Sequence, residues 1–537
     1  MTLISSTGSV LLDRIAASRT ASTYRPAGMS AQAASRPTHV TLDAAGADTD
    51  LYAKPKALNL GAQRFWATAR EDSLSEQMAR NSGKDAVTLS DRWRGLGGGL
   101  LKQFAATGEG YKQTLADYVP SATAAEGVTA TEGTSATDTA AAVAALREQA
   151  VGGVATNAAE VSLKIQTRSG HTVELTIGVN SGDQGGTRGL QVEVKSSGAL
   201  SSAERKALAI LSDGLDRALE DLGEGAPTLD LSGLTGFDQD GVLTGLDLKI
   251  ENPNARPDVP GAMQSFAMHL GTDTKSLSLR TTSGEINLEV DAATPKGGVN
   301  NGQRWSAIDQ LLQQIDAAAD RGHADAAMTQ AFKDAFQLLQ APPVDAGGSA
   351  AGSGAQDDAG SNSMATGAPK LMNAASDAPS AITPTMSDGL RSQVESMQSG
   401  LADFKAEFSA DSQRKSRIGS IKETGHADYK ISQTTTDRPN NATGGRTITQ
   451  TQTEEMEASF QKSRSFTLDR DSGNYDATTV QDKKTVTTMI DTVKDSVSRA
   501  MRKTDEDRRK TFTQVENFKA TAHNEWPSQR SFVERLR

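Results

Sequence analysis

Residues 162–177 read Ser-Leu-Lys-Ile-Gln-Thr-Arg-Ser-Gly-His-Thr-Val-Glu-Leu-Thr-Ile, with apolar and polar residues alternating on both sides of a turn. Side chains two residues apart lie on the same face of a β-strand, so each half of this stretch has one apolar and one polar face. Arg168-Ser169-Gly170 contains the small and flexible residues that reverse a chain. The stretch therefore predicts a β-hairpin.

A second hairpin of the same kind is predicted further along the chain. It begins with Ser-Leu-Ser-Leu-Arg-Thr-Thr-Ser-Gly (276–284), and its return strand carries Ile286, Leu288 and Val290. Leu190, Val192 and Val194 predict another strand between the two hairpins. Hairpins share sequence constraints, so the likeness indicates a sheet of similar units and not a solenoid array.

Helices are predicted between and after these strands. Ser201 followed by Glu204 is a capping box, and Gly223 with Pro227 ends the helix that it starts. Apolar residues at helical spacing predict two more helices, over 305–315 and 328–339. An antiparallel sheet with helices packed on one face buries all of these apolar faces, so we expect an α+β fold flanked by helical segments and disordered linkers.

The C-terminal region shows a different periodicity. Its clearest pattern is a 3.5-residue repeat with steps of 4, 3, 4, 3 and 4, formed by Leu390, Val394, Met397, Leu401, Phe404 and Phe408. This heptad seam predicts a helix over 387–411 that associates with another helix, and its six residues are the predicted interaction residues. A second helix is predicted near the C-terminus, from Ile490, Val493, Val497 and Met501 and then from Phe512, Val515 and Phe518. Between the helices, runs of Thr and Gln around Tyr429, Ile431 and Ile448 predict long polar strands.

Shifts in composition divide the chain into six predicted parts. These are a disordered N-terminal tail (1–60), amphipathic helices (61–120), an Ala/Thr/Gly linker (121–157), the α+β domain (158–341), a Gly/Ser/Ala linker (342–386), and a heptad helix with a polar β-hairpin and a C-terminal helix (387–537).

Composition excludes several kinds of chemistry. The 537 residues contain no cysteine, so disulfides, thiolate metal sites and cysteine nucleophiles are ruled out. The chain has 56 Lys and Arg residues and 67 Asp and Glu residues, so its net charge is 56 − 67 = −11. This negative charge argues against nucleic acid as the partner. No stretch approaches the roughly 20 apolar residues of a membrane-spanning helix. The predicted partner is a protein or a second copy of the chain, without nucleic acid, transmembrane segment or small molecule.

Motifs for catalysis or metal binding are missing from the sequence. The six histidines are not at metal-ligand spacing, and neither a nucleophile elbow nor a phosphate-binding loop occurs. Asp238-Gln239-Asp240-Gly241 could begin a calcium loop, but the other EF-hand ligands are absent, so an ordinary turn is favoured. We therefore predict no catalytic, cofactor-binding or metal-binding residue and no cofactor.

One region contains a recognisable series of short sequence motifs. It contains Leu-Ser-Ser-Ala-Glu-Arg (200–205), Leu-Ser-Asp-Gly-Leu-Asp (211–216), Leu-Asp-Leu-Ser-Gly-Leu (229–234) and Gly-Leu-Asp-Leu-Lys-Ile (245–250). Over about 190–251 the chain resembles an uncharacterised group of bacterial proteins in which a strand, an acidic Leu-rich helix and short Leu/Asp strands recur. The resemblance implies a bacterial source and carries no activity or catalytic residues.

These observations favour a non-enzymatic bacterial interaction or structural protein that associates through its helical seams. An exported effector or surface-associated protein is the alternative, because residues 1–42 contain a single acidic residue, Asp13, as in a disordered leader. An enzyme with an unrecognised acidic site is a further alternative. The expected location is the cytoplasm or, for the exported alternative, outside the cell without a cleavable Sec signal peptide.

Overall fold

Both predicted hairpins are present in the computed structural model, and their apolar faces are buried. Strand β5 (Ala159–Thr167) pairs with β6 (Thr172–Asn180), and β10 (Thr274–Thr281) pairs with β11 (Gly284–Asp291). The predicted strand around Val192 is β7 (Arg188–Ser196), which pairs with β6. The alternating pattern that predicted these strands is confirmed.

The structure describes residues 56–341 and 386–536, apart from 58–62, 84, 119–128, 131–135, 155–158, 181–187, 224–228, 230, 236, 238–240, 293–300, 441–443, 465–466 and 469–471. The predicted N-terminal tail apart from Lys56 and Ala57, part of the 121–157 linker, nearly all of the 342–386 linker and Asp238 to Asp240 of the candidate calcium turn lie outside the described residues.

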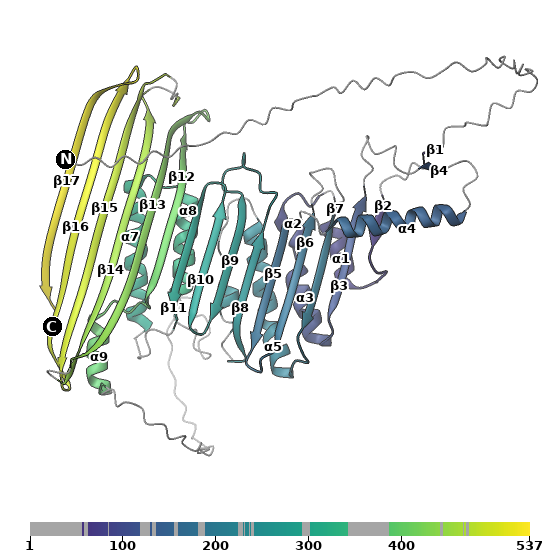
Figure 1. The fold of residues 1–537 in the computed structure, drawn as a ribbon, viewed down its shortest axis with the longest axis horizontal. Coiled ribbons are helices and arrows are strands. Elements are labelled where there is room, and N and C mark those ends of the chain that lie inside the picture. Colours follow the sequence, from purple (N-terminus) through teal and green to yellow (C-terminus); the bar gives the residue numbers. More distant parts are fainter. Residues whose placement is uncertain are drawn as a thin grey trace, which may run out of the picture. The chain divides into compact units, whose positions relative to one another are not determined.

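A single antiparallel sheet of fifteen of the described strands dominates the structure (Figure 1). Its strand order is β17-β16-β15-β14-β13-β12-β11-β10-β9-β8-β5-β6-β7-β3-β2, so from β8 onward each strand pairs with its neighbour in sequence. The remaining strands of the sheet are β2 (Gln63–Trp66), β3 (Tyr111–Tyr118), β8 (Leu243–Glu251), β9 (Met263–Gly271), β12 (Phe404–Lys415), β13 (Ile421–Asn440), β14 (Gly445–Ser463), β15 (Tyr475–Val493), β16 (Ser496–Glu516) and β17 (Lys519–Arg535). Two short strands, β1 (Lys56–Ala57) and β4 (Thr129–Ala130), pair with each other.

The predicted α+β class, with helices packed on one face of a sheet and helical segments beside it, is wrong. Strands occupy most of the C-terminal region where helices were predicted, and β11 of the 158–341 segment pairs directly with β12 of the next one. Helices also contact both faces of the sheet. Leu115 of β3 lies in the apolar cluster of α3, whereas the adjacent Ala116 lies in that of α4, and neighbouring strand residues point to opposite faces.

The described part of the chain also forms helices, which pack against this sheet or against one another. They are α1 (Ser73–Asn81), α2 (Leu89–Trp93), α3 (Leu96–Thr107), α4 (Ala136–Gly153), α5 (Ser202–Gly223), α6 (Ser232–Thr235), α7 (Asn301–Gly322), α8 (Ala326–Gln340) and α9 (Asp388–Met397). Helices α3 and α5 pack together, α8 contacts β10 to β12, α7 contacts β13 and β14, and α9 contacts β16. The predicted helices over 201–223, 305–315 and 328–339 are therefore confirmed as α5, α7 and α8.

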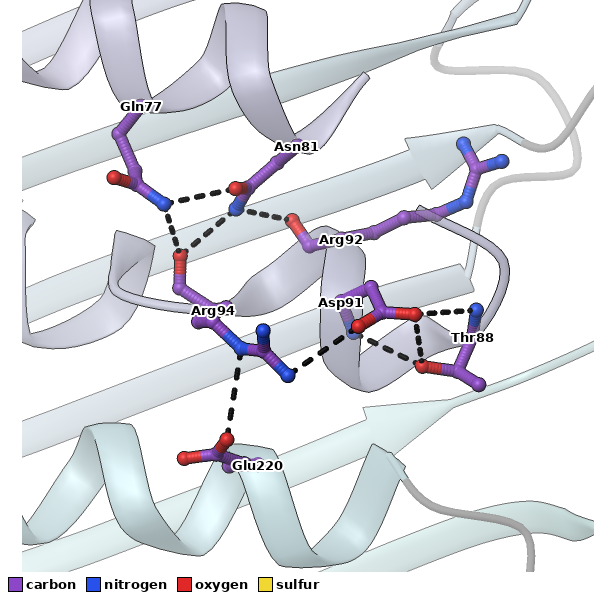
Figure 2. Close-up of polar contacts among 7 residues, drawn as sticks. All are labelled: Gln77, Asn81, Thr88, Asp91, Arg92, Arg94 and Glu220. Atoms are coloured by element: carbon purple, nitrogen blue, oxygen red, sulfur yellow. Dashed lines mark hydrogen bonds and ion pairs between the residues drawn. The ribbon is translucent and has the colours of Figure 1, made fainter. Parts of the chain in front are cut away.

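Residues 61–120, predicted as amphipathic helices, also form strands β2 and β3. The helical stretch is broken between α2 and α3, where Gly95 adopts a left-handed conformation with φ of 69°. Figure 2 shows the polar contacts that fix this break: Asn81 donates from Nδ2 to the carbonyl oxygens of Arg92 (3.0 Å) and Arg94 (2.8 Å). Thr88 and Asp91 form a capping box at the start of α2. The Asn81 side chain thus satisfies carbonyls that a continuous helix would have bonded internally, and the capping box satisfies the N–H groups of Thr88 and Asp91.

Of the two predicted C-terminal helices, the first forms over only part of its length and the second does not form. The helix over 387–411 ends at Met397, Gly400 has φ of 80°, and Phe404 to Lys415 is strand β12. The region 490–518, predicted as a helix, forms parts of β15 and β16 joined by a turn in which Lys494 has φ of 53°. In β12 the buried residues Phe404, Ala406, Phe408 and Ala410 have the period of two that marks a strand. The predicted long polar strands around Tyr429 and Ile448 are β13 and β14, which pair along most of their length.

Glu204 joins the start of α5 to the hairpin turn of β5 and β6, and its replacement tests this junction. It accepts hydrogen bonds from Ser201 N (2.7 Å) and Ser169 Oγ, while Glu204 N donates to Ser201 Oγ (3.3 Å), which confirms the predicted capping box. Burial by itself would raise the pKa of Glu204, but these hydrogen bonds lower it to about 2. We expect Glu204→Ala to lower the free energy of unfolding by about 1–2 kcal/mol at neutral pH, measured by urea denaturation.

The same junction predicts a pH dependence. A carboxyl group with a lowered pKa in the folded state stabilises the protein fully above its ordinary pKa of 4.5, and this stabilisation is lost as the pH falls toward 2. The difference in stability between the wild type and Glu204→Ala should therefore shrink below about pH 4. Glu204→Gln is the matched control, because its amide keeps an acceptor but does not titrate in this range. A difference that stays constant down to pH 3 would contradict this role.

Candidate functional site

The six predicted interaction residues are buried within this chain. Leu390, Val394 and Met397 lie on α9 and pack with Ile448, Ile490 and Ala500 of the sheet. Phe404 and Phe408 lie on β12, where their rings contact those of Phe336 (centroids 5.1 Å apart) and Phe332 (5.8 Å) on α8. All six are between 4% and 7% exposed. The structure thus divides the predicted seam into two parts. The first part lies on a helix that packs on the sheet, and the second includes residues of a strand within the sheet.

Three exposed large apolar side chains of the C-terminal region lie on one strand, β17, which we call the edge strand, whereas Ile418 and Phe518 are exposed in turns. The edge strand pairs with β16 on one side, and no described strand pairs with it on the other, where it forms the outermost yellow strand in Figure 1. Trp526 is 53% exposed, Phe532 is 55% exposed and Val533 is 58% exposed. Large apolar side chains gathered on an open strand are typical of surfaces that bind other chains.

The register shows which face each of these side chains occupies. Trp526 is paired with Lys510 and Phe532 with Thr504, and both partners alternate in phase with Ala500, which packs against α9. Because paired residues share a face, Trp526 and Phe532 lie on the α9 face of the sheet. Val533, the next residue, lies on the opposite face.

The direction of the free backbone groups follows from one hydrogen bond. Leu536 N donates to Ala500 O at 3.1 Å, so the even-numbered residues of this register bond to β16. Hydrogen bonding alternates along an antiparallel strand, and the register is unbroken between 523 and 535. The odd-numbered residues of this range therefore direct their N–H and C=O groups to the open side.

Pro527 lies among these odd-numbered residues and has no N–H to offer. An approaching strand loses one hydrogen bond there, worth about 1 kcal/mol. A proline at such a position limits indiscriminate pairing of open edges. The backbone on either side of Pro527 keeps its donors and acceptors. The edge strand can therefore still pair with another strand, although it forms one hydrogen bond fewer than a strand without proline.

Polar contacts hold the edge strand in place against β16. Ser531 Oγ donates to Asp505 at 2.7 Å, and Arg509 forms an ion pair with Glu525 at 3.3 Å. Lys503 and then Ser531 lower the pKa of Asp505. These contacts fix β17 as an ordered strand, so an incoming chain would meet a prearranged edge.

A serine, a histidine and two aspartates meet on the opposite face of the sheet from α9. His426 Nδ1 lies 2.8 Å from Asp411 Oδ1, and its Nε2 lies 3.2 Å from Asp428 Oδ2 and 3.4 Å from Ser409 Oγ. Burial would lower the pKa of His426, but the two carboxylates raise it. Both ring nitrogens lie beside carboxylates, so neither nitrogen is set aside to accept a proton from Ser409. The N–H groups beside Ser409 are used in pairing with β11 and β13, which leaves none for an oxyanion.

The same face carries a hollow of about 580 Å³ lined by charged side chains of β13 to β16. Lys430, Glu455, Lys483 and Asp507 follow one another across paired strands, and Glu455 lies 2.6 Å from Lys483. Opposite charges that face each other in this way stabilise a sheet. Among the described residues, no group of three or more potential ligands is placed to hold a metal ion.

No family model, curated protein or solved structure matches this chain. The resemblance predicted over 190–251 therefore stays a prediction. In the part of the chain that the structure describes, no helix is both long and apolar enough to cross a membrane.

The edge strand was missed in the sequence because its apolar residues do not alternate regularly. Two signals could have identified it. Asn517 and Phe518, both with positive φ, form the two-residue turn that leads into β17, and asparagine is common in such turns. Pro527 within a polar stretch is typical of an edge strand.

Proposed function

We propose that this protein functions by binding other protein chains rather than by catalysis, and that the edge strand is its contact surface. The observation that carries this proposal is an open strand of 17 residues with Trp526, Phe532 and Val533 exposed along it. A strand that joins such an edge gains main-chain hydrogen bonds, while its side chains contact the exposed apolar groups. Tryptophan is also among the residues that contribute most to binding at interfaces.

The polar clusters support binding over catalysis because their charges are already paired. His426 is held between two aspartates, and the charged row through Glu455 and Lys483 is neutralised across the strands. Neither arrangement leaves a base, a nucleophile or a converging set of donors for a substrate.

A photo-crosslinking residue at Gln529 of the full-length chain tests this proposal in the cells that naturally make the protein. The backbone N–H and C=O groups of Gln529 point to the open side of the edge strand, where a bound chain would lie. We therefore expect a covalent adduct with a protein chain after illumination. The same residue placed at Ile418, which is 82% exposed in the turn between β12 and β13, is the matched control and should give no adduct. Trp526→Ser with Phe532→Ser should weaken the adduct at Gln529 without changing thermal unfolding by more than about 0.5 kcal/mol. The proposal fails if Gln529 gives no more adduct than Ile418.

A further inference from the structure

We infer that the chain bound at the edge strand is a second copy of this protein, paired antiparallel about a two-fold axis at Gln529. This inference rests on the proposed function and names its partner. The first observation is a symmetry in the sequence: Trp526 and Phe532 each lie three residues from Gln529, one on either side. Both lie on the α9 face, and both are exposed to a similar extent.

The backbone permits this arrangement. Odd-numbered residues present free N–H and C=O groups, so an antiparallel copy must set odd-numbered residues opposite odd-numbered ones. A two-fold axis at Gln529 does so: Gln529 faces itself, Ser531 faces Pro527, Val533 faces Glu525 and Arg535 faces His523. All of the outward hydrogen bonds between these residues can form except the one that Pro527 lacks in each copy.

The side chains select this register among its neighbours. On the α9 face, Trp526 of each copy faces Phe532 of the other, Ser528 faces Arg530, and Asn524 faces Glu534. Aromatic side chains directly opposite each other on paired strands attract. Moving the axis to Arg530 would set that cation against its own copy and Trp526 against Glu534. Moving it to Ser528 would set Phe532 against Asn524 and separate the two aromatic residues.

The resulting contact is closed. A two-fold interface uses the same surface on both copies, so pairing at β17 consumes the edge strand of each. The other end of the sheet is β2, which is four residues long and offers little backbone for a further strand. The inferred assembly is therefore a dimer with one continuous sheet, and the α9 helices of both copies lie on the same face.

The absence of cysteine makes a direct test possible. Residues facing each other in a hydrogen-bonded pair have Cα atoms about 5.5 Å apart, within the range of a disulfide. Gln529→Cys in the full-length chain should therefore form a disulfide-linked dimer under mild oxidation. Ser531→Cys should not link to itself, because the two copies of residue 531 lie about 14 Å apart in this register. A mixture of Ser531→Cys and Pro527→Cys should give the mixed dimer.

Sedimentation of the untagged full-length chain separates the failure of this inference from that of the proposed function. We expect a monomer–dimer equilibrium that Trp526→Ser with Phe532→Ser weakens by about tenfold or more. A dimer whose Gln529→Cys variant does not link, while Ser531→Cys links to itself, would overturn the register. A wild-type chain that stays monomeric, with Gln529 crosslinked to a different protein in cells, would overturn the second copy as partner and leave the proposed function standing.

Discussion

Replacing Phe332 with alanine is expected to lower the free energy of unfolding by about 3–5 kcal/mol. Phe332 is 1% exposed on α8, and its ring lies 5.8 Å from that of Phe408 on β12 and 6.1 Å from that of Tyr429 on β13, measured between centroids. Removal of the ring leaves a cavity between the helix and the two strands. The neighbouring aromatic side chains are themselves fixed by the sheet, so they cannot move far enough to fill it.

Phe332→Leu is the matched control and should cost about 1.5 kcal/mol or less, because it keeps most of the apolar volume. Urea denaturation measures the loss, and amide hydrogen exchange shows where it falls. We expect faster exchange in α8, β12 and β13, with little change in β5 to β7. Equal losses for alanine and leucine would contradict a cavity as the cause.

Replacing Gly98 with alanine is expected to destabilise the protein by about 1–3 kcal/mol, although alanine is the better helix former. A Cβ at this position would lie 2.2 Å from Asp216 Oδ2 and 2.6 Å from Ser212 O of α5. Gly98 N also donates to Asp216 Oδ1 at 2.6 Å, and this hydrogen bond spans the same contact. The backbone oxygen of Ser212 cannot rotate away, so the two helices must separate.

Gly152→Ala provides the control of opposite sign. Gly152 lies in α4, and a Cβ there meets nothing within 4 Å. Alanine should therefore stabilise the protein by about 0.5–1 kcal/mol. Thermal or urea unfolding of the two variants measures both effects. If Gly98→Ala is as stable as the wild type, the close approach of α3 to α5 does not require glycine.

The sequence predicted those elements whose buried face is made of large apolar residues. In β5 and β6 the inward positions are Val, Leu and Ile, and in α5 they are leucines, so the periods of two and 3.6 are visible without the structure. The capping box at Ser201 was equally visible because it depends on two polar residues at fixed spacing.

The C-terminal region was misread because its inward positions are largely polar. Along β15 the buried residues include Thr478 and Thr488, and along β16 they include Thr504, so counting only large apolar residues leaves spacings of three and four that imitate a helix. In β12 the small residues Ala406 and Ala410 complete the period of two. A pattern read from large apolar residues takes in Phe404 and Phe408 but not these alanines. Edge position is a property of the whole sheet, so the residues of β17 give only indirect signs of it, such as Pro527.

The order of the strands has a consequence for synthesis of the chain. From β9 to β17 each strand pairs with the one made just before it, and apart from the β11–β12 pair these contacts are close in sequence and form without waiting for distant segments. Strand β5, in contrast, waits for β8 until α5 has been made. As the chain leaves the ribosome, each of the strands β9 to β16 is for a time the unpaired edge of the sheet, until the next strand pairs with it. Within a single chain, strand β17 stays in the state through which β9 to β16 each pass once, and only another chain can pair with its open side.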